Sequence, residues 1–302
     1  MTTYNKKALP GVGYEYFDID LSKMSNTEIR DFGKVLIEDN VILLRNQNLD
    51  KENLNRVVHA IGRVKTSERP WFFLDEDFSG LGRVTNNRDE HGKKLGVFAD
   101  KDLDWHSNGN NRETGRECCV SLYCVRPGVD SVTSFCDTRK AYQELPDDIK
   151  EIVNDVDCNF RFMNNTFYDL DDGDQELEFF DNTEMYPDDL VKPLVYTHPF
   201  SEEKGLYFTF HSIRNMWRRS GAPLDEQWLR DYLLKHVFQE KYIYHHDTWA
   251  TGDLIFMDQF HSIHKRNEVK GDRFLYRVTL DYSKSLREML IQRQKQNASL
   301  TQ

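Results

Sequence analysis

The chain has no hydrophobic run that approaches the roughly 18 apolar residues of a membrane-spanning helix. Its first residues, Met1–Gly13, carry two lysines but no apolar stretch, so they do not have the form of a secretory signal. These two absences predict a cytoplasmic protein that has no membrane partner.

The chain also has fewer basic than acidic residues. The chain has 40 Lys and Arg against 51 Asp and Glu, which gives a net charge of −11. General nucleic-acid binding requires a basic face, so this balance argues against a nucleic-acid partner. The acidic residues gather in Asp169–Glu178, where a solvated loop is expected. A calcium loop is the alternative, but no glycine and distal glutamate lie where an EF-hand requires them.

Cysteine is scarce, with five residues in the 302 of the chain. The number is odd and no pair has the Cys-x-x-Cys spacing, so neither a disulfide framework nor a zinc knuckle is indicated. Four of the five lie in strand-like segments, where we expect them to be small core residues. The cysteines are Cys118, Cys119, Cys124, Cys136 and Cys158.

The organisation of the chain favours one domain over residues 1–302, because no internal repeat or low-complexity linker divides it. Residues 1–63 are interpreted as an α/β entry segment. Within it, Ser25 to Glu28 forms a capping box, Val41–Leu44 has the pattern of a buried strand, and Asp50 is placed to cap a second helix.

From about residue 81 to 285 the pattern changes to short β segments separated by turns. Helices are expected over Asp147–Val156 and over Pro223–Phe238, with Trp228 on the buried face of the second. Short strands with helices packed to one side predict a mostly β protein with flanking helices, a double-stranded β-helix (jelly roll, cupin-like). The expected strands are Cys119–Val125, Val132–Cys136, Phe160–Phe162, Leu206–Phe210, Leu254–Met257 and Phe274–Tyr282.

Two separated histidines carry the pattern of a non-haem iron site. Such a site needs two imidazoles and a carboxylate on one side of the metal. His106 and position 108 have the spacing that points two side chains of a strand the same way, and His264 follows a buried strand far downstream. His261 competes with His264, but three residues earlier on a strand it would face the opposite side. Position 108 is an amide, Asn108, instead of a carboxylate.

Arginines follow the second histidine. Arg273 and Arg277 are four residues apart among apolar neighbours, which predicts that both are buried on one face of a strand. A buried arginine is a natural partner for a carboxylate, and Thr133 could add a hydroxyl donor.

In this arrangement the chain resembles the TauD/TfdA-like (taurine dioxygenase) family of Fe(II)/2-oxoglutarate-dependent oxygenases. The likeness rests on seven motifs in order over nearly the whole length. They are Val41–Leu49, Val84–Asn86 followed by Gly92, Trp105–Asn108, Asp130–Pro146, Thr197–Tyr207, Gly252–His264 and Arg273–Thr279.

The resemblance implies that His106 and His264 bind Fe(II), with Asn108 in the place of the third ligand. It implies that Arg273 and Thr133 hold the distal carboxylate of 2-oxoglutarate and that Arg277 lies near its metal-bound end. Iron and 2-oxoglutarate would activate O2, with succinate and carbon dioxide as by-products. The implied walls of the substrate pocket are Asn86, His198, Tyr207, Phe210 and His211.

Asn108 leaves three readings open. In the first, its amide oxygen binds the metal or the two histidines suffice, and the enzyme still oxygenates its substrate. In the second, chloride takes the vacated position and the enzyme is a halogenase, although an asparagine nearly isosteric with aspartate should fill that space. In the third, the chain is a pseudoenzyme or an inactivated variant that binds small molecules without turnover.

The expected substrate is a small polar molecule, such as an amino acid, an amine or a sulfonate, because the implied walls are polar and aromatic. The sequence does not decide between a monomer and a homo-oligomer.

Overall fold

Two β-sheets form the centre of the protein. The computed structural model describes residues 4–65, 73–96, 102–108, 118–160, 190–282 and 288. The larger sheet has eight strands in the order β1-β2-β3-β15-β7-β17-β4, with β5 also paired to β17. Its strands are β1 (Lys6–Ala8), β2 (Tyr14–Tyr16), β3 (Val41–Leu44), β4 (Gly62–Val64), β5 (Gly82–Thr85), β7 (Cys119–Val129), β15 (Leu254–Asp258) and β17 (Lys270–Tyr282).

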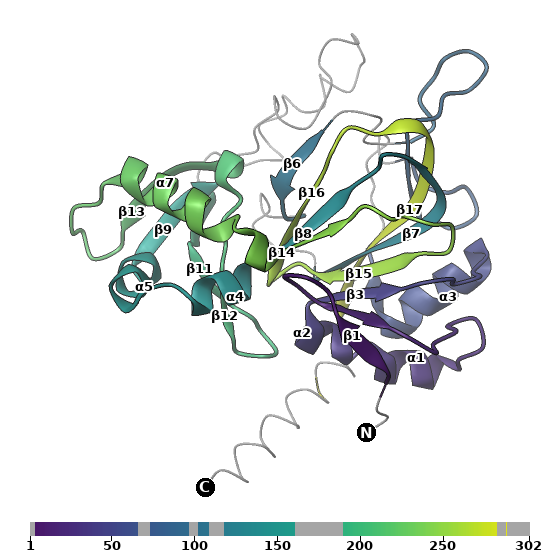
Figure 1. Ribbon diagram of the computed structural model, residues 1–302, viewed down its shortest axis with the longest axis horizontal. Helices are drawn as coiled ribbons and strands as arrows, with labels where there is room; N and C mark the ends of the chain where they lie inside the picture. Colours follow the sequence, from purple (N-terminus) through teal and green to yellow (C-terminus); the bar gives the residue numbers. More distant parts are fainter. Residues whose placement is uncertain are drawn as a thin grey trace, which may run out of the picture.

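The smaller sheet has four strands in the order β14-β8-β16-β6 and lies against the larger one (Figure 1). Its strands are β6 (Leu103–His106), β8 (Thr133–Asp137), β14 (Ile243–His246) and β16 (Ser262–Arg266). The prediction of a mostly β jelly roll with flanking helices is confirmed.

The two faces of the larger sheet bury different cores, as the two-residue period of a strand requires. On β15, Leu254 and Phe256 join a core with the N-terminal helices, whereas Ile255 and Met257 face the other way. That second core also contains Phe135 of the smaller sheet, so it fills the space between the two sheets. The side chains of the site described below enter this space at one end.

The N-terminal helices cover the outer face of the larger sheet (Figure 1). They are α1 (Asn26–Phe32), α2 (Val35–Asp39) and α3 (Lys51–Ile61). The capping predictions are confirmed, because Ser25 and Glu28 form a capping box on α1 and the Asp50 carboxylate accepts a hydrogen bond from the Asn53 amide at the start of α3.

A second group of helices packs on the outer face of the smaller sheet together with two short sheets, β10-β9-β13 and β11-β12. The elements are α4 (Thr138–Gln143), α5 (Asp147–Asn154), β9 (Val156–Phe160), β10 (Leu190–Pro193), β11 (Val195–Thr197), β12 (Lys204–Leu206), η5 (Phe210–Ser212), β13 (Ile213–Arg218), α7 (Glu226–Val237) and η6 (Glu240–Tyr242).

Three details differ from the sequence-based expectations. Helix α7 begins after Asp225, whose carboxylate caps it, and not at Pro223. Trp228 lies on the exposed face of that helix, because Leu229 and Leu233 supply the buried face. The strand expected over Leu206–Phe210 ends at Leu206, after which the chain turns into η5. The acidic segment Asp169–Glu178 lies outside the described residues.

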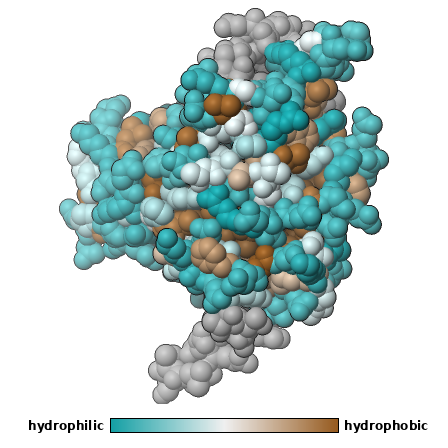
Figure 2. All heavy atoms as spheres, turned by 45° about the vertical axis from the view of Figure 1, so that its right-hand side comes forward, coloured by the Kyte–Doolittle hydropathy of each residue, from teal (hydrophilic) through white to brown (hydrophobic). Residues whose placement is uncertain are grey.

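All five cysteines are free thiols and buried, which confirms their assignment as core residues. Among the described residues, no helix is long and apolar enough to cross a membrane. On the face shown in Figure 2 the surface is mostly hydrophilic, with hydrophobic side chains scattered over it.

Gly252 makes the turn that leads into β15. Its φ is +87°, and a Cβ atom there would lie 2.7 Å from the carbonyl oxygen of Gln47. Gly92 has a similar φ of +81° but nothing within 4 Å of its Cβ position. We expect Gly92→Ala to lose about 1–2 kcal/mol of the free energy of unfolding through its backbone conformation alone. Gly252→Ala should lose about 1–3 kcal/mol more through the added clash. Urea unfolding of both variants measures the difference, and equal losses would contradict this explanation.

Candidate metal and 2-oxo acid site

The two predicted histidine ligands face each other across neighbouring strands. His264 of β16 is the direct partner of His106 of β6, and the ring centroids are 4.2 Å apart. Nδ1 of His106 lies 2.7 Å from the carbonyl oxygen of Asp104. Since a carbonyl only accepts, Nδ1 carries the proton and Nε2 keeps a lone pair for a metal.

His264 is also prepared as a ligand. Burial lowers its pKa well below the ordinary value, and the neighbouring His106 and Arg277 lower it further, so the ring is neutral. Its Nδ1 is buried and has no hydrogen-bond partner among the described residues. Two imidazoles at this separation suit a divalent first-row metal ion.

Asn108 reaches the same cavity by a different route from the one expected. Strand β6 ends at His106, so Asn108 lies in a turn and not on the strand. The backbone N–H of Asn108 donates to Oε1 of Gln259 (3.0 Å), and the Ser107 hydroxyl donates to the backbone carbonyl oxygen of Gln259 (3.3 Å). The buried Nδ2 of Asn108 has no partner among the described residues. Gln259, which the sequence did not indicate, therefore places the third candidate ligand.

Thr133 and Arg273 lie at the other end of the cavity. Both are buried, and the Thr133 hydroxyl accepts a hydrogen bond from Nε1 of Trp249 (3.2 Å), which leaves its own proton for an acceptor. Burial, together with the positive charge of Arg266, lowers the pKa of Arg273 to about 9. Nε of Arg273 is a buried donor with no partner in the described part of the chain. A carboxylate bound here would satisfy it.

The cavity between these groups is strongly cationic. Its described lining includes three arginines and no acidic residue. It is small, about 40 Å³, so a ligand the size of 2-oxoglutarate enters only if side chains around it move. The lining residues are Val84, Leu103, His106, Asn108, Leu122, Thr133, His264, Arg266, Arg273 and Arg277. The metal and cosubstrate residues predicted from the sequence are thus brought together, and Arg266 is added to them.

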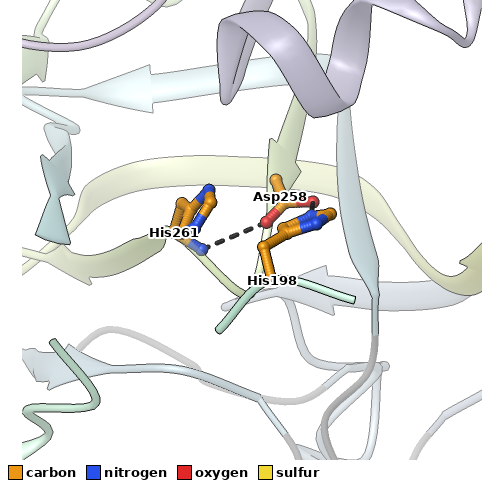
Figure 3. Close-up of side chains that lie close together, drawn as sticks. All are labelled: His198, Asp258 and His261. Atoms are coloured by element: carbon orange, nitrogen blue, oxygen red, sulfur yellow. Dashed lines mark hydrogen bonds and ion pairs between the residues drawn. The ribbon is translucent and has the colours of Figure 1, made fainter. Parts of the chain in front are cut away.

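His198 and His261 gather around the carboxylate of Asp258 (Figure 3). Nδ1 of His198 accepts from two backbone N–H groups, so Nε2 carries the proton and donates to Asp258 (3.2 Å). The same carboxylate accepts from the Tyr282 hydroxyl and from the amides of Phe260 and His261. The lone pairs of its two oxygens already accept these hydrogen bonds, so the cluster is not a second metal site. We call this hydrogen-bonded cluster around Asp258 the anchor.

The charge state of the anchor follows from its contacts. Burial raises the pKa of Asp258, but the interactions with His198 and the hydrogen bond from Tyr282 outweigh it, and the pKa is lowered. Burial lowers the pKa of His261 to about 3, so this ring is neutral. The choice of His264 over His261 as the metal-facing histidine agrees with this geometry.

The predicted substrate walls lie elsewhere. His198 belongs to the anchor, and the Asn86 amide is used on the backbone of β17, where it accepts from the Arg273 N–H and donates to the Gly271 carbonyl. Tyr207 is buried against Phe160 in the outer core, while Phe210 contacts other aromatic rings. None of these four is among the described residues around the cavity. The side chain of His211 lies outside the described part.

Known proteins resemble the chain over most of its length. The family model described as Taurine catabolism dioxygenase TauD, TfdA family matches residues 5–279. The alpha-ketoglutarate-dependent 2,4-dichlorophenoxyacetate dioxygenase of Burkholderia sp. (strain RASC) is 26% identical over 268 residues, which cover 85% of this chain and 86% of that protein. The enzyme of the same name from Cupriavidus pinatubonensis (strain JMP 134 / LMG 1197) is 27% identical over 276 residues, covering 87% and 92%.

Solved structures show the same fold. A crystal structure of AAD-2 in complex with Mn(II) and N-oxalylglycine matches with a TM-score of 0.69 and 20% identity, covering 94% of this chain and 99% of that chain. A taurine dioxygenase from Burkholderia xenovorans matches with a TM-score of 0.70 and 19% identity, covering 93% and 90%.

The buried, neutral His261 has a consequence for stability. Its ordinary pKa of about 6.5 in the unfolded chain exceeds its folded value of about 3, so the unfolded state gains a proton first as the pH falls. Stability is therefore lost progressively below about pH 6.5. We expect His261→Gln to reduce the pH slope of the unfolding free energy between pH 6 and 4 by about 1.4 kcal/mol per pH unit.

Urea unfolding at each pH measures this slope. His91→Gln is the control, because the His91 side chain lies on the surface. A slope for His261→Gln equal to that of the unchanged protein would contradict the buried, neutral assignment.

Proposed function

Because the chain belongs to the taurine catabolism dioxygenase TauD, TfdA family, we propose that it oxidises a small organic anion with 2-oxoglutarate as its cosubstrate. It is an alpha-ketoglutarate-dependent dioxygenase that uses Fe(II), 2-oxoglutarate and O2.

The observation that carries the proposal is the pairing of His106 with His264 in one cationic cavity with Arg273. The two histidines and the Asn108 amide oxygen would hold the metal. Thr133 and Arg273 bind the distal carboxylate of 2-oxoglutarate. When bound, the iron would supply the activation of O2 for oxidation of the substrate, coupled to conversion of 2-oxoglutarate to succinate and carbon dioxide.

The substrate is expected to be an anion. The cavity holds three guanidinium groups without an acidic residue in its described lining, so a cationic amine would be repelled. Arg277 lies on the histidine side, since its positive charge acts on His264. Val84 and Leu122 add apolar contacts. The curated relatives are named for 2,4-dichlorophenoxyacetate, a carboxylate, which supports a carboxylate or sulfonate substrate.

The amide of Asn108 favours oxygenation over halogenation. Gln259 fixes its backbone, and its side chain lines the cavity beside the histidines, in the space that a chloride would need. An amide oxygen is neutral, so it binds a divalent cation more weakly than a carboxylate does.

The central experiment measures the binding and the turnover of the cosubstrate. Under anaerobic conditions the protein is titrated with Fe(II) and 2-oxoglutarate, and the visible charge-transfer band is recorded. Oxygen is then admitted with candidate carboxylates and sulfonates, and succinate is measured. We expect the band and substrate-dependent succinate. A band without succinate would favour a binding protein, and succinate that requires chloride, with a chlorinated product, would favour a halogenase.

A change at position 108 tests the role of the amide. We expect Asn108→Asp to lower the dissociation constant of Fe(II) by about ten-fold, because it restores a charged oxygen ligand. Asn108→Ala is the matched variant that removes the oxygen, and it should weaken Fe(II) binding. Anaerobic titration with Fe(II) measures both. Equal affinities in all three proteins would show that position 108 does not touch the metal.

A further inference from the structure

Ser134 lies on the face of the smaller sheet that points away from the metal cavity. Its neighbour Phe135 packs into the core between the two sheets, so the two-residue period of β8 turns Ser134 to the outer face. On that face, Cys136 and its strand partners Ile243 and Ile263 are buried under the helices. The row of side chains that contains Ser134 comes next along the sheet, and it lines an open basin of about 610 Å³.

Three polar side chains form this row. Ser134 of β8 has His245 of β14 as its direct partner on one side and Lys265 of β16 on the other. The Cβ atoms of such direct partners are about 4.5–5.5 Å apart. All three residues line the basin, and none of them belongs to the described lining of the metal cavity. A hydroxyl group is therefore flanked by an imidazole and an ammonium group on the surface of one basin.

The hydrogen bonds of His245 fix its tautomer. Its Nε2 lies 3.1 Å from Oε2 of Glu240 in η6, and a carboxylate oxygen only accepts. Nε2 therefore carries the proton, and Nδ1, which lies 2.7 Å from Oγ of Ser134, accepts the hydrogen bond of the serine hydroxyl. A nucleophile that donates to a base, with the base oriented by a third group, is the arrangement that activates serine for nucleophilic attack.

A substrate in the basin could reach these groups. Ser134 is nearly buried, but the His245 side chain beside it is 40% exposed. Nζ of Lys265 lies 5.0 Å from the centre of the Trp105 ring and makes no ion pair with any described residue. Its positive charge can therefore stabilise an oxygen that becomes negative next to Ser134.

The lining of the basin indicates the class of substrate. Its volume is in the range of sites that bind small molecules. Two acidic and two basic side chains line it and offset one another, which favours a molecule without net charge, and two aliphatic side chains add apolar contacts. These residues are Asp102, Asp104, Lys265, Arg266, Leu103 and Val132.

We propose that Ser134 is the nucleophile of a second site, separate from the metal cavity, that hydrolyses small uncharged carboxylic esters. Oγ of Ser134 bonds to the ester carbonyl carbon while its proton moves to Nδ1 of His245, and Lys265 stabilises the negative carbonyl oxygen. The bond to the alkoxy group then breaks, and that group leaves as an alcohol with the proton from His245. His245 next takes a proton from the water that attacks the acyl-serine, and returns it to Oγ of Ser134 as the acid is released.

Glu240 is a positioning residue in this scheme, because it orients His245 and stabilises its protonated form. Glu240→Gln keeps an oxygen that can accept the hydrogen bond but loses the charge. We expect it to lower kcat a few-fold with little change in KM. The free energy of unfolding should stay the same, because Glu240 is exposed.

The test uses the full chain and p-nitrophenyl acetate, with and without Fe(II). We expect hydrolysis above the rate in buffer, and the same rate in both conditions. Ser134→Ala and His245→Gln should each lower this rate about ten-fold or more, because the nucleophile or the general base is lost. Lys265→Met should lower kcat more than it raises KM, because the ammonium group acts on charge that develops during the reaction.

Ser121→Ala is the matched control. Ser121 is a buried strand serine whose hydroxyl has no hydrogen-bond partner among the described residues, and it is outside the described lining of the basin. Its replacement should leave the rate unchanged. Phenylmethylsulfonyl fluoride is a second probe, which should sulfonylate Ser134 of the unchanged protein, and mass spectrometry locates the label. This measurement needs no variant, so it decides the question even if Ser134→Ala does not fold.

Four results would overturn the proposal. They are hydrolysis by the unchanged protein no faster than in buffer, hydrolysis that requires Fe(II), a Ser134→Ala rate equal to that of the unchanged protein, and no label on Ser134. Each is independent of the oxygenase, because succinate formation from 2-oxoglutarate is measured separately and should be the same in Ser134→Ala.

Discussion

The buried carboxylate of Asp258 is the constraint on which the site depends. It lies at the end of β15 and receives hydrogen bonds from His198, from Tyr282 of β17 and from the amides of Phe260 and His261. These bonds fix the turn from β15 to β16. The strand that leaves this turn presents His264, so an error in the turn would be passed directly to the candidate metal site.

The same turn also positions the other side of the site. Its residue Gln259 accepts a hydrogen bond from the Asn108 amide and another from the Ser107 hydroxyl. One short connection therefore controls both His264 and the segment that follows His106. This arrangement places the two candidate histidine ligands on strands, while Asn108 belongs to a turn.

The balance of charge in the cavity explains the low pKa of Arg273. Burying guanidinium groups is costly unless they are paired, and here the low pKa of Arg273 reflects that cost. The carboxylate of a 2-oxo acid beside Arg273 would supply a compensating negative charge. Replacing a carboxylate by Asn108 removes one more negative charge from the cavity, so the site depends more on its ligands for neutrality than one with an acidic residue would.

The sequence determined much of the fold and of the candidate site. The apolar neighbours of Arg273 and Arg277 predicted that both would be buried, and the succession of short strands and helices predicted the jelly roll. The motifs around His106 and His264 predicted that these two histidines would belong to one site. The two-residue period of a strand could have found Arg266, two residues after His264, because both must face the same side of β16.

Only the tertiary structure decided which polar residues share a cavity. His198 was expected at the substrate and instead anchors a turn through Asp258, sixty residues away in the chain. Asn86 was expected there too, but its amide is used on the backbone of β17, 187 residues away at Arg273. Gln259 reaches Asn108 across 151 residues. Sequence periodicity reports which way a side chain points from its own strand, but these partners are set by how strands and turns pack, and no local pattern encodes that contact.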